Sequence, residues 1–122
     1  MKRLHVHVNV EDLASAIRFY TTLFGTGPCM IKDDFAKWIL EDPLVYFAIS
    51  KSGRAAGLAH LGIQMQTVDE LTQVAGRLRA AGEITREERV GTTYKTWVDD
   101  PSGLIWETFF PSADPSVVSV SR

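Results

Sequence analysis

Apolar and polar side chains alternate near the start of the chain. In residues 4–10, LHVHVNV, every second side chain is apolar, which predicts a strand with one face buried. His5, His7 and Asn9 lie on the opposite face from the valines. A helix is expected over residues 13–24, because its apolar side chains recur at spacings of three and four. Asp12 is a natural N-cap for this helix, and Gly25 is a natural C-cap.

The pattern of the first residues returns later in the chain. Residues 35–42 and 44–50 predict two strands around a turn at Asp42-Pro43. Residues 59–65 repeat the opening strand, and a second helix with Gly82 as its C-cap follows. His60 answers His5 at an offset of 55, and Asp100-Pro101 answers Asp42-Pro43 at an offset of 58. Because these landmarks recur in one order, the chain is interpreted as an internal duplication.

The expected organisation has four segments. A first module covers residues 1–50, a linker covers 51–57, a second module covers 58–110, and a tail rich in serine and proline covers 111–122. The stretch VVSVS in this tail is an alternative candidate for a short edge strand.

Composition narrows the class of protein. The chain has 122 residues, 45% hydrophobic and 23% charged, which is typical of a single globular unit or two small halves that share a core. A net charge of −2 does not favour a nucleic-acid partner. No apolar run is long enough for a membrane span, and no signal peptide is recognised, so a cytoplasmic protein is expected. With Cys29 as the single cysteine, neither an intrachain disulfide nor a cysteine-based zinc site is expected.

The phase of the predicted strands suggests a metal site. His5 and His60 both point away from the helix-packing side chains, and they occupy equivalent places in the duplication. Glu107 lies on the Ile105 and Phe109 face of a late strand, beside one of the histidines. Two imidazoles and one carboxylate with open positions suit Fe²⁺, and also Mn²⁺, Ni²⁺, Co²⁺ or Zn²⁺. A lone strand histidine is more often a surface or core residue, but a buried Glu107 needs a partner, which favours the metal.

The residues that carry these features resemble the vicinal oxygen chelate superfamily of glyoxalase I, bleomycin and fosfomycin resistance proteins, and extradiol dioxygenases. The resemblance covers about residues 1–110. It implies an α+β fold in which paired βαβββ modules form a cupped, partly open mixed sheet barrel around a divalent metal. It places the metal ligands on His5, His60 and Glu107. His7 matches no usual ligand position and is interpreted as a residue that supports a ligand, faces the substrate or simply lines the cup.

Within the superfamily, the chain looks most like the cadmium-induced protein and carbon–arsenic lyase branch. That Fe²⁺-dependent, O₂-using branch holds trivalent arsenic through a vicinal cysteine pair. The matching stretch here, RVGTTYKTWV, contains no cysteine, so the metal triad carries over and the arsenic-binding pair does not. Residues 46–49, where some members have a fourth ligand, contain neither carboxylate nor imidazole. This disfavours glyoxalase I itself.

Three functions are therefore weighed. The first is a metal-dependent enzyme, an Fe²⁺ dioxygenase or a lyase, acting on a small molecule with Thr92, Thr93, Tyr94 and Lys95 as a substrate-side loop. A solvated turn explains that loop equally well. The second is a drug-sequestering protein of the bleomycin-resistance kind, with aromatic side chains that also have a core-packing interpretation. Those side chains are Trp38, Phe47, Trp97, Trp106 and Phe109. The third is a metal- or stress-responsive protein without catalysis. A homodimer is expected in each case.

Overall fold

The computed structural model describes residues 2–110 of the chain. The tail and the VVSVS strand expected at 111–122 lie outside the described residues. The chain divides into two compact units. We call residues 5–59 the N-terminal unit, and residues 1–4 together with those from 60 onward the C-terminal unit. The division passes through the first and fifth strands, and each unit is described by itself.

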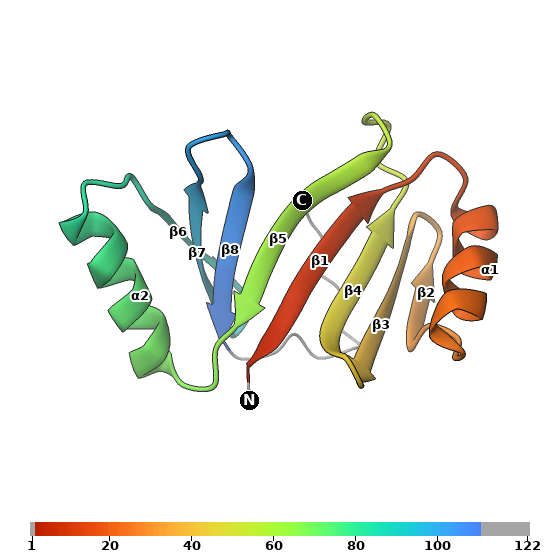
Figure 1. The fold of residues 1–122 in the computed structure, drawn as a ribbon, viewed down its shortest axis with the longest axis horizontal. Coiled ribbons are helices and arrows are strands. Elements are labelled where there is room, and N and C mark those ends of the chain that lie inside the picture. Colours follow the sequence, from red (N-terminus) through yellow and green to blue (C-terminus); the bar gives the residue numbers. More distant parts are fainter. Residues whose placement is uncertain (1, 111–122) are drawn as a thin grey trace. The chain divides into compact units, whose positions relative to one another are not determined.

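The order of helices and strands repeats once along the chain (Figure 1). The elements are β1 (Arg3–Asn9), α1 (Leu13–Phe24), β2 (Met30–Lys32), β3 (Phe35–Glu41), β4 (Leu44–Ser50), β5 (Gly57–Gln64), α2 (Val68–Ala80), β6 (Arg86–Val90), β7 (Thr93–Asp99) and β8 (Ile105–Phe110). The predicted α+β class and the paired βαβββ modules are confirmed. Among these elements, β2 and β6 were not located by the sequence pattern, because one is short and the other is highly charged.

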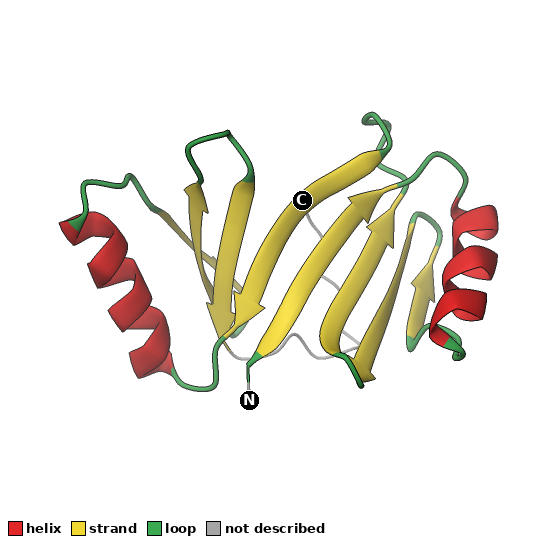
Figure 2. Ribbon diagram, viewed as in Figure 1, coloured by secondary structure: helices red, strands yellow, loops and turns green. Residues whose placement is uncertain are grey.

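In the N-terminal unit the strand order is β2-β3-β4-β1, with α1 on one side (Figure 2). The expected caps of α1 are confirmed: the Asp12 carboxylate accepts a hydrogen bond from the Ser15 amide at 3.3 Å, and Gly25 has a φ of 76°. A buried aromatic and aliphatic cluster joins β3 and β4 to α1. The valines of β1 pack against this cluster, as the alternation in the sequence predicts.

In the C-terminal unit the order is β5-β8-β7-β6, and β5 runs parallel to β8 while the other pairs are antiparallel. Thr67 caps α2 by accepting from the Glu70 amide at 3.1 Å. The expected C-cap at Gly82 is wrong by one residue: Ala81 is the cap, and Gly82 follows with a φ of 90°. The glycine therefore supplies the left-handed turn just after the helix. Within residues 2–110, no helix is long and apolar enough to cross a membrane.

Candidate metal centre

The face of the N-terminal unit that points away from α1 carries polar side chains. Trp38 and Phe47 are register partners in the helix-side core, so the alternating neighbours Lys37 and Tyr46 point to the other face. His5 lies on this second face and contacts the Tyr46 ring, with a distance of 4.3 Å between ring centroids. His5 is only 4% exposed, although it belongs to the polar side of a strand that the sequence pattern describes as half-buried.

A backbone contact fixes the orientation of His5. Its Nδ1 lies 3.2 Å from the carbonyl oxygen of Tyr46. A carbonyl can only accept a hydrogen bond, so Nδ1 carries the proton and Nε2 carries the lone pair. Metal-binding histidines are commonly oriented in this way, through a hydrogen bond from the second ring nitrogen. His5 therefore has the tautomer that a metal ligand needs.

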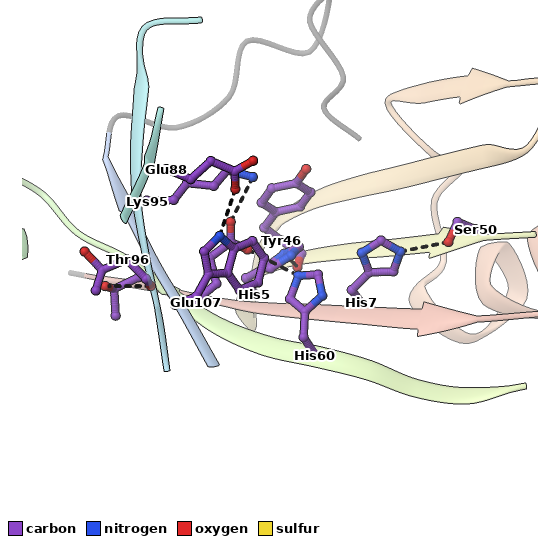
Figure 3. A network of polar contacts seen from close by, with 11 residues as sticks. His5, His7, Tyr46, Ser50, His60, Glu88, Lys95, Thr96 and Glu107 are labelled. Atoms are coloured by element: carbon purple, nitrogen blue, oxygen red, sulfur yellow. Dashed lines mark hydrogen bonds and ion pairs between the residues drawn. The ribbon is translucent and has the colours of Figure 1, made fainter. Parts of the chain in front are cut away.

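His7 is held through its other nitrogen. Its Nε2 lies 2.8 Å from the Ser50 hydroxyl, which in turn donates to the Asn9 side-chain oxygen at 3.5 Å (Figure 3). The Ser50 hydroxyl can donate to or accept from the His7 ring nitrogen, so this contact holds the ring in place with either tautomer. The two histidines of β1 share a face and are both buried, but their anchoring contacts differ.

In the C-terminal unit, His60 and Glu107 lie together. The Nε2 of His60 is 3.2 Å from Oε1 of Glu107, and the two residues are 6% and 3% exposed. The register of β7 with β8 places Glu107 opposite Trp97 and on the face expected from the sequence. The prediction that Glu107 is buried and needs a partner is confirmed. It is also confirmed that Glu107 lies beside one of the two equivalent histidines.

Lys95 is the second partner of Glu107. Its Nζ lies 3.0 Å from Oε2 of that carboxylate (Figure 3). The interpretation of residues 92–95 as one loop is wrong, because Thr93, Tyr94 and Lys95 belong to β7 and only Thr92 lies in the preceding turn. A strand alternates its side chains, so these residues do not form a single surface.

Tyr94 points to the opposite face of β7 from Lys95. Its register partner is Phe110, whereas Lys95 pairs with Phe109 on the Glu107 side. Tyr94 is 42% exposed, lines a groove between α2 and β6–β7, and has the Arg89 guanidinium 5.0 Å from its ring centroid. The tyrosine is therefore separated from Glu107 by the sheet.

Trp97 orients the His60 side of this cluster. Its ring meets His60 edge to face, with centroids 5.1 Å apart and planes at 79°. Its Nε1 donates a hydrogen bond of 2.8 Å to Oε1 of Glu88 on β6. Sequence reasoning grouped Trp97 only with the other aromatic residues. The usable signal was its position two residues after Lys95, which puts both on one strand face. Trp38 and Phe47, by contrast, have the core-packing role that was also considered.

The donor geometry of the C-terminal unit fits a metal ion. Metal bonds to imidazole nitrogen and carboxylate oxygen are about 2.0–2.2 Å long, so two such ligands at a right angle lie about 3 Å apart. The 3.2 Å between His60 Nε2 and Glu107 Oε1 matches that separation. A donor set of imidazole nitrogen and carboxylate oxygen suits Fe²⁺, Ni²⁺, Mn²⁺, Co²⁺ and Zn²⁺.

Comparison of sequences identifies related proteins. A profile of the Glyoxalase/Bleomycin resistance protein/Dioxygenase superfamily matches residues 2–108. A trivalent organoarsenical cleaving enzyme of Bacillus sp. (strain MD1) is 35% identical over 118 residues, which span 90% of this chain and 73% of that protein. The cadmium-induced protein CadI of Mycobacterium tuberculosis (strain H37Rv) is 34% identical over 121 residues, 93% of this chain and 79% of that protein. The predicted resemblance to this branch is confirmed.

Comparison of structures shows the same fold at lower sequence identity. An extradiol ring-cleaving dioxygenase from B. fuscum matches with a TM-score of 0.74 and 19% identity, over 91% of this chain and 33% of that one. Methylmalonyl-CoA epimerase from Mycobacterium tuberculosis matches with a TM-score of 0.66 and 20% identity, over 89% of this chain and 87% of that one. Proteins with this fold therefore carry different activities.

Proposed function

Because the chain belongs to the Glyoxalase/Bleomycin resistance protein/Dioxygenase superfamily, we propose that it is a divalent-metal-dependent enzyme that acts on a small molecule. His5, His60 and Glu107 are the proposed ligands. The contact between His60 and Glu107 carries the proposal, since it joins a buried imidazole and a buried carboxylate at the separation of two neighbouring metal ligands. Fe²⁺ is favoured among the possible metals because two histidines and one carboxylate are its usual donor set in oxygenases.

Each proposed ligand has a separate task. Glu107 supplies the negative charge that a divalent cation needs in a buried site. His5 is held by the Tyr46 carbonyl, so its Nε2 carries the lone pair. His60 packs against Trp97, with the two rings nearly perpendicular. When bound, the metal supplies Lewis acidity toward a substrate oxygen or, as Fe²⁺, redox chemistry with O₂.

The substrate-side residues are drawn from the Glu107 face of β7 and from β1. We assign Thr93 and Lys95 to this group because they share that strand face, and His7 because it is buried on the same face as His5. Thr92, in the turn before β7, stays a candidate from the sequence alone. Tyr94 is left out because the register places its side chain on the opposite face of β7 from Lys95 and Glu107.

We infer that the substrate is not the trivalent organoarsenical named for the Bacillus relative. Cys29 is the only cysteine of the chain, and it is exposed. Soft trivalent arsenic is best held by thiolates, and the Thr92-Thr93 stretch offers only hydroxyl oxygens. We therefore propose a substrate that binds through oxygen, converted by a dioxygenase or a lyase reaction. Drug sequestration without catalysis is the alternative.

Metal content tests the proposal. The purified protein is reconstituted separately with Fe²⁺, Mn²⁺, Ni²⁺, Co²⁺ and Zn²⁺ and analysed by mass spectrometry. The wild type and the matched control His7→Ala are expected to hold stoichiometric metal, whereas His5→Ala, His60→Ala and Glu107→Ala lose it. Circular dichroism checks that each variant folds. A wild type that takes up no metal, or ligand variants that load normally, would exclude the metal site.

Oxygen uptake separates the reaction types. The Fe²⁺-loaded protein is supplied with a catechol and with a trivalent organoarsenical as probe substrates. Consumption of O₂ with cleavage of the catechol ring supports a dioxygenase, whereas release of inorganic arsenic from the organoarsenical supports a lyase, with or without O₂ consumption. Tight binding of either probe without turnover supports sequestration.

We also propose that the protein works in the cytoplasm as a homodimer. The outer side of α1 supports the dimer, since the apolar side chains of Phe19 and Leu23 are each 61% exposed there. Light scattering after size-exclusion chromatography measures the mass, and a monomer at micromolar concentration contradicts the dimer.

A further inference from the structure

The carboxylate of Glu107 has its two oxygens committed to different partners. Oε1 faces His60 Nε2 at 3.2 Å, and Oε2 faces Lys95 Nζ at 3.0 Å. We propose that Lys95 is a positioning residue that keeps Glu107 a one-oxygen ligand of the metal. This inference rests on the proposed metal site and assigns Lys95 a role other than direct contact with the substrate.

The local strand geometry holds Lys95 in this position. Lys95 pairs with Phe109 and Trp97 pairs with Glu107, so Lys95 and Glu107 are diagonal neighbours on one face of β7 and β8. The ammonium also lies 5.6 Å from the centroid of the Trp97 ring, within the range of a cation–π contact. The lysine is therefore positioned from two sides.

Burial makes the ion pair effective. The side chains of Lys95 and Glu107 are 10% and 4% exposed. A charge pair at this depth is screened much less by salt and water than a surface pair. The attraction between Lys95 and Glu107 is therefore stronger than that of an exposed ion pair.

The consequence for the metal follows from how carboxylates coordinate. A carboxylate can bind a cation through one oxygen or through both. An ammonium group in contact with Oε2 occupies that oxygen and repels a cation from it, so only Oε1 is directed to the metal. A one-oxygen ligand leaves one more position for exogenous ligands on a six-coordinate ion than a two-oxygen ligand does. Lys95 would thereby help the site accept a substrate and a second small ligand together.

The test replaces Lys95 by uncharged and charged side chains. Lys95→Met keeps most of the length and removes the charge, Lys95→Arg keeps the charge, and Lys51→Met removes the same charge from an exposed position. Each protein is loaded with Mn²⁺. Metal affinity is measured by competition with a chelator, and the number of exchangeable water ligands is measured by electron paramagnetic resonance in ¹⁷O-labelled water.

We expect Lys95→Met to bind Mn²⁺ about tenfold more tightly and to lose one exchangeable water, because the repulsion of the ammonium is removed and both oxygens of Glu107 then reach the metal. Lys95→Arg and Lys51→Met are expected to match the wild type in both measurements. The water count is the decisive reading, since a lysine that merely stabilises the fold or contacts the substrate would not change it.

Three outcomes would overturn the inference. Lys95→Met with the wild-type water count and affinity removes the positioning role, and so does a Lys95→Met variant that no longer binds Mn²⁺. If the wild type itself binds no metal, the proposed function fails and this inference fails with it. If the wild type binds metal and only the expected effect of Lys95→Met is absent, the inference fails alone. Should Lys95→Met not fold by circular dichroism, Lys95→Gln carries the same measurements.

Discussion

The two units place their histidines in equivalent positions and orient them differently. In the N-terminal unit, His5 donates through Nδ1 to the backbone carbonyl of Tyr46. In the C-terminal unit, His60 contacts the carboxylate of Glu107 through Nε2. The register shows that Tyr46 and Glu107 correspond, because each is the partner of equivalent residues on the preceding strand of its module. The N-terminal unit thus has an imidazole oriented by a backbone carbonyl, and the C-terminal unit has an imidazole beside a carboxylate.

The lysines beside these residues extend the comparison. Lys37 and Lys95 correspond at the offset of 58 that also relates the two Asp-Pro turns. Lys95 forms an ion pair with the Glu107 carboxylate, whereas Lys37 lies 5.2 Å from the centroid of the Tyr46 ring. Each unit therefore has a lysine and a histidine that both contact one residue between them, which is Tyr46 in the N-terminal unit and Glu107 in the C-terminal unit. The N-terminal unit thus has an aromatic ring at the position where the C-terminal unit has a carboxylate.

The helix-facing sides of the units also differ. The N-terminal unit has an aromatic core in which Trp38 is 1% exposed. At the position equivalent to Trp38, the C-terminal unit has Thr96, which is 3% exposed. The larger side chains bury more apolar surface, so the N-terminal core should be the more sensitive to truncation.

Truncation of the two equivalent core residues should give the largest effect. Trp38→Ala is expected to lower the free energy of unfolding by about 3–5 kcal/mol, because it leaves a large cavity and removes the Nε1 hydrogen bond to the Thr26 carbonyl. Thr96→Ala should cost about 1 kcal/mol. Urea denaturation followed by circular dichroism measures both. Equal losses would contradict the difference between the two cores.

Substitution of Glu107 and of the corresponding Tyr46 should separate the roles of these two residues in metal binding. Glu107→Gln keeps the shape of the side chain and removes its charge, so the affinity for Mn²⁺ should fall by about 100-fold or more. Tyr46→Phe should change that affinity less than about twofold, since the contact to His5 comes from the Tyr46 backbone. Chelator competition measures both constants. A Tyr46→Phe variant as weak as Glu107→Gln would place the tyrosine hydroxyl among the ligands.

A carboxylate at position 46 should make the N-terminal unit resemble the C-terminal unit in its contribution to metal binding. Tyr46→Glu places a carboxylate where the C-terminal unit has Glu107, and it should tighten Mn²⁺ binding about tenfold while removing an exchangeable water. Tyr46→Gln is the uncharged control and should do neither. The same competition and ¹⁷O measurements apply. If Tyr46→Glu binds metal no better than Tyr46→Gln, the two positions are equivalent in register only.

The sequence predicted the parts of this picture that depend on local periodicity. Alternation of side chains placed His5 and Glu107 away from the helices, and the burial of Glu107 among apolar neighbours implied a partner. The contact of Lys95 with Glu107 depends on the register of two strands, which is a property of distant pairing. The interpretation of Thr92 to Lys95 as a loop or a turn hid the start of β7. The anchor of His5 was invisible because its acceptor is a backbone carbonyl.

Turn length explains why the correspondence of Tyr46 with Glu107 was also missed. Residues 42–43 join β3 to β4, whereas residues 100–104 join β7 to β8. The longer second turn moves the offset from 58 before the turn to 61 after it, so the equivalent residues do not align at one spacing. Only the observed strand ends reveal this shift.

The longer turn gives the smallest predicted effect. Oδ1 of Asp100 accepts hydrogen bonds from the Ser102 amide at 2.8 Å, the Ser102 hydroxyl at 2.7 Å and the Leu104 amide at 2.9 Å. The Ser102 hydroxyl is the main cause that lowers the pKa of Asp100 below its ordinary value of 3.8. A carboxyl whose pKa is lower in the folded chain stabilises the fold above the unfolded value, and this contribution is lost as the pH falls through the folded value.

Asp100→Asn keeps an oxygen acceptor and removes the charge. We expect this variant to be slightly less stable than the wild type at pH 7, and the gap between them to close as the pH falls below about 3.8. Urea midpoints measured from pH 7 down to about pH 2.5 test the expectation. In a Ser102→Ala background, Asp100→Asn should cause a smaller loss of stability than in the wild type. The Ser102 hydroxyl, which is the largest cause of the lowered pKa of Asp100, is absent there. A gap that stays constant across this range would mean that the turn depends on the shape of Asp100 and not on its charge.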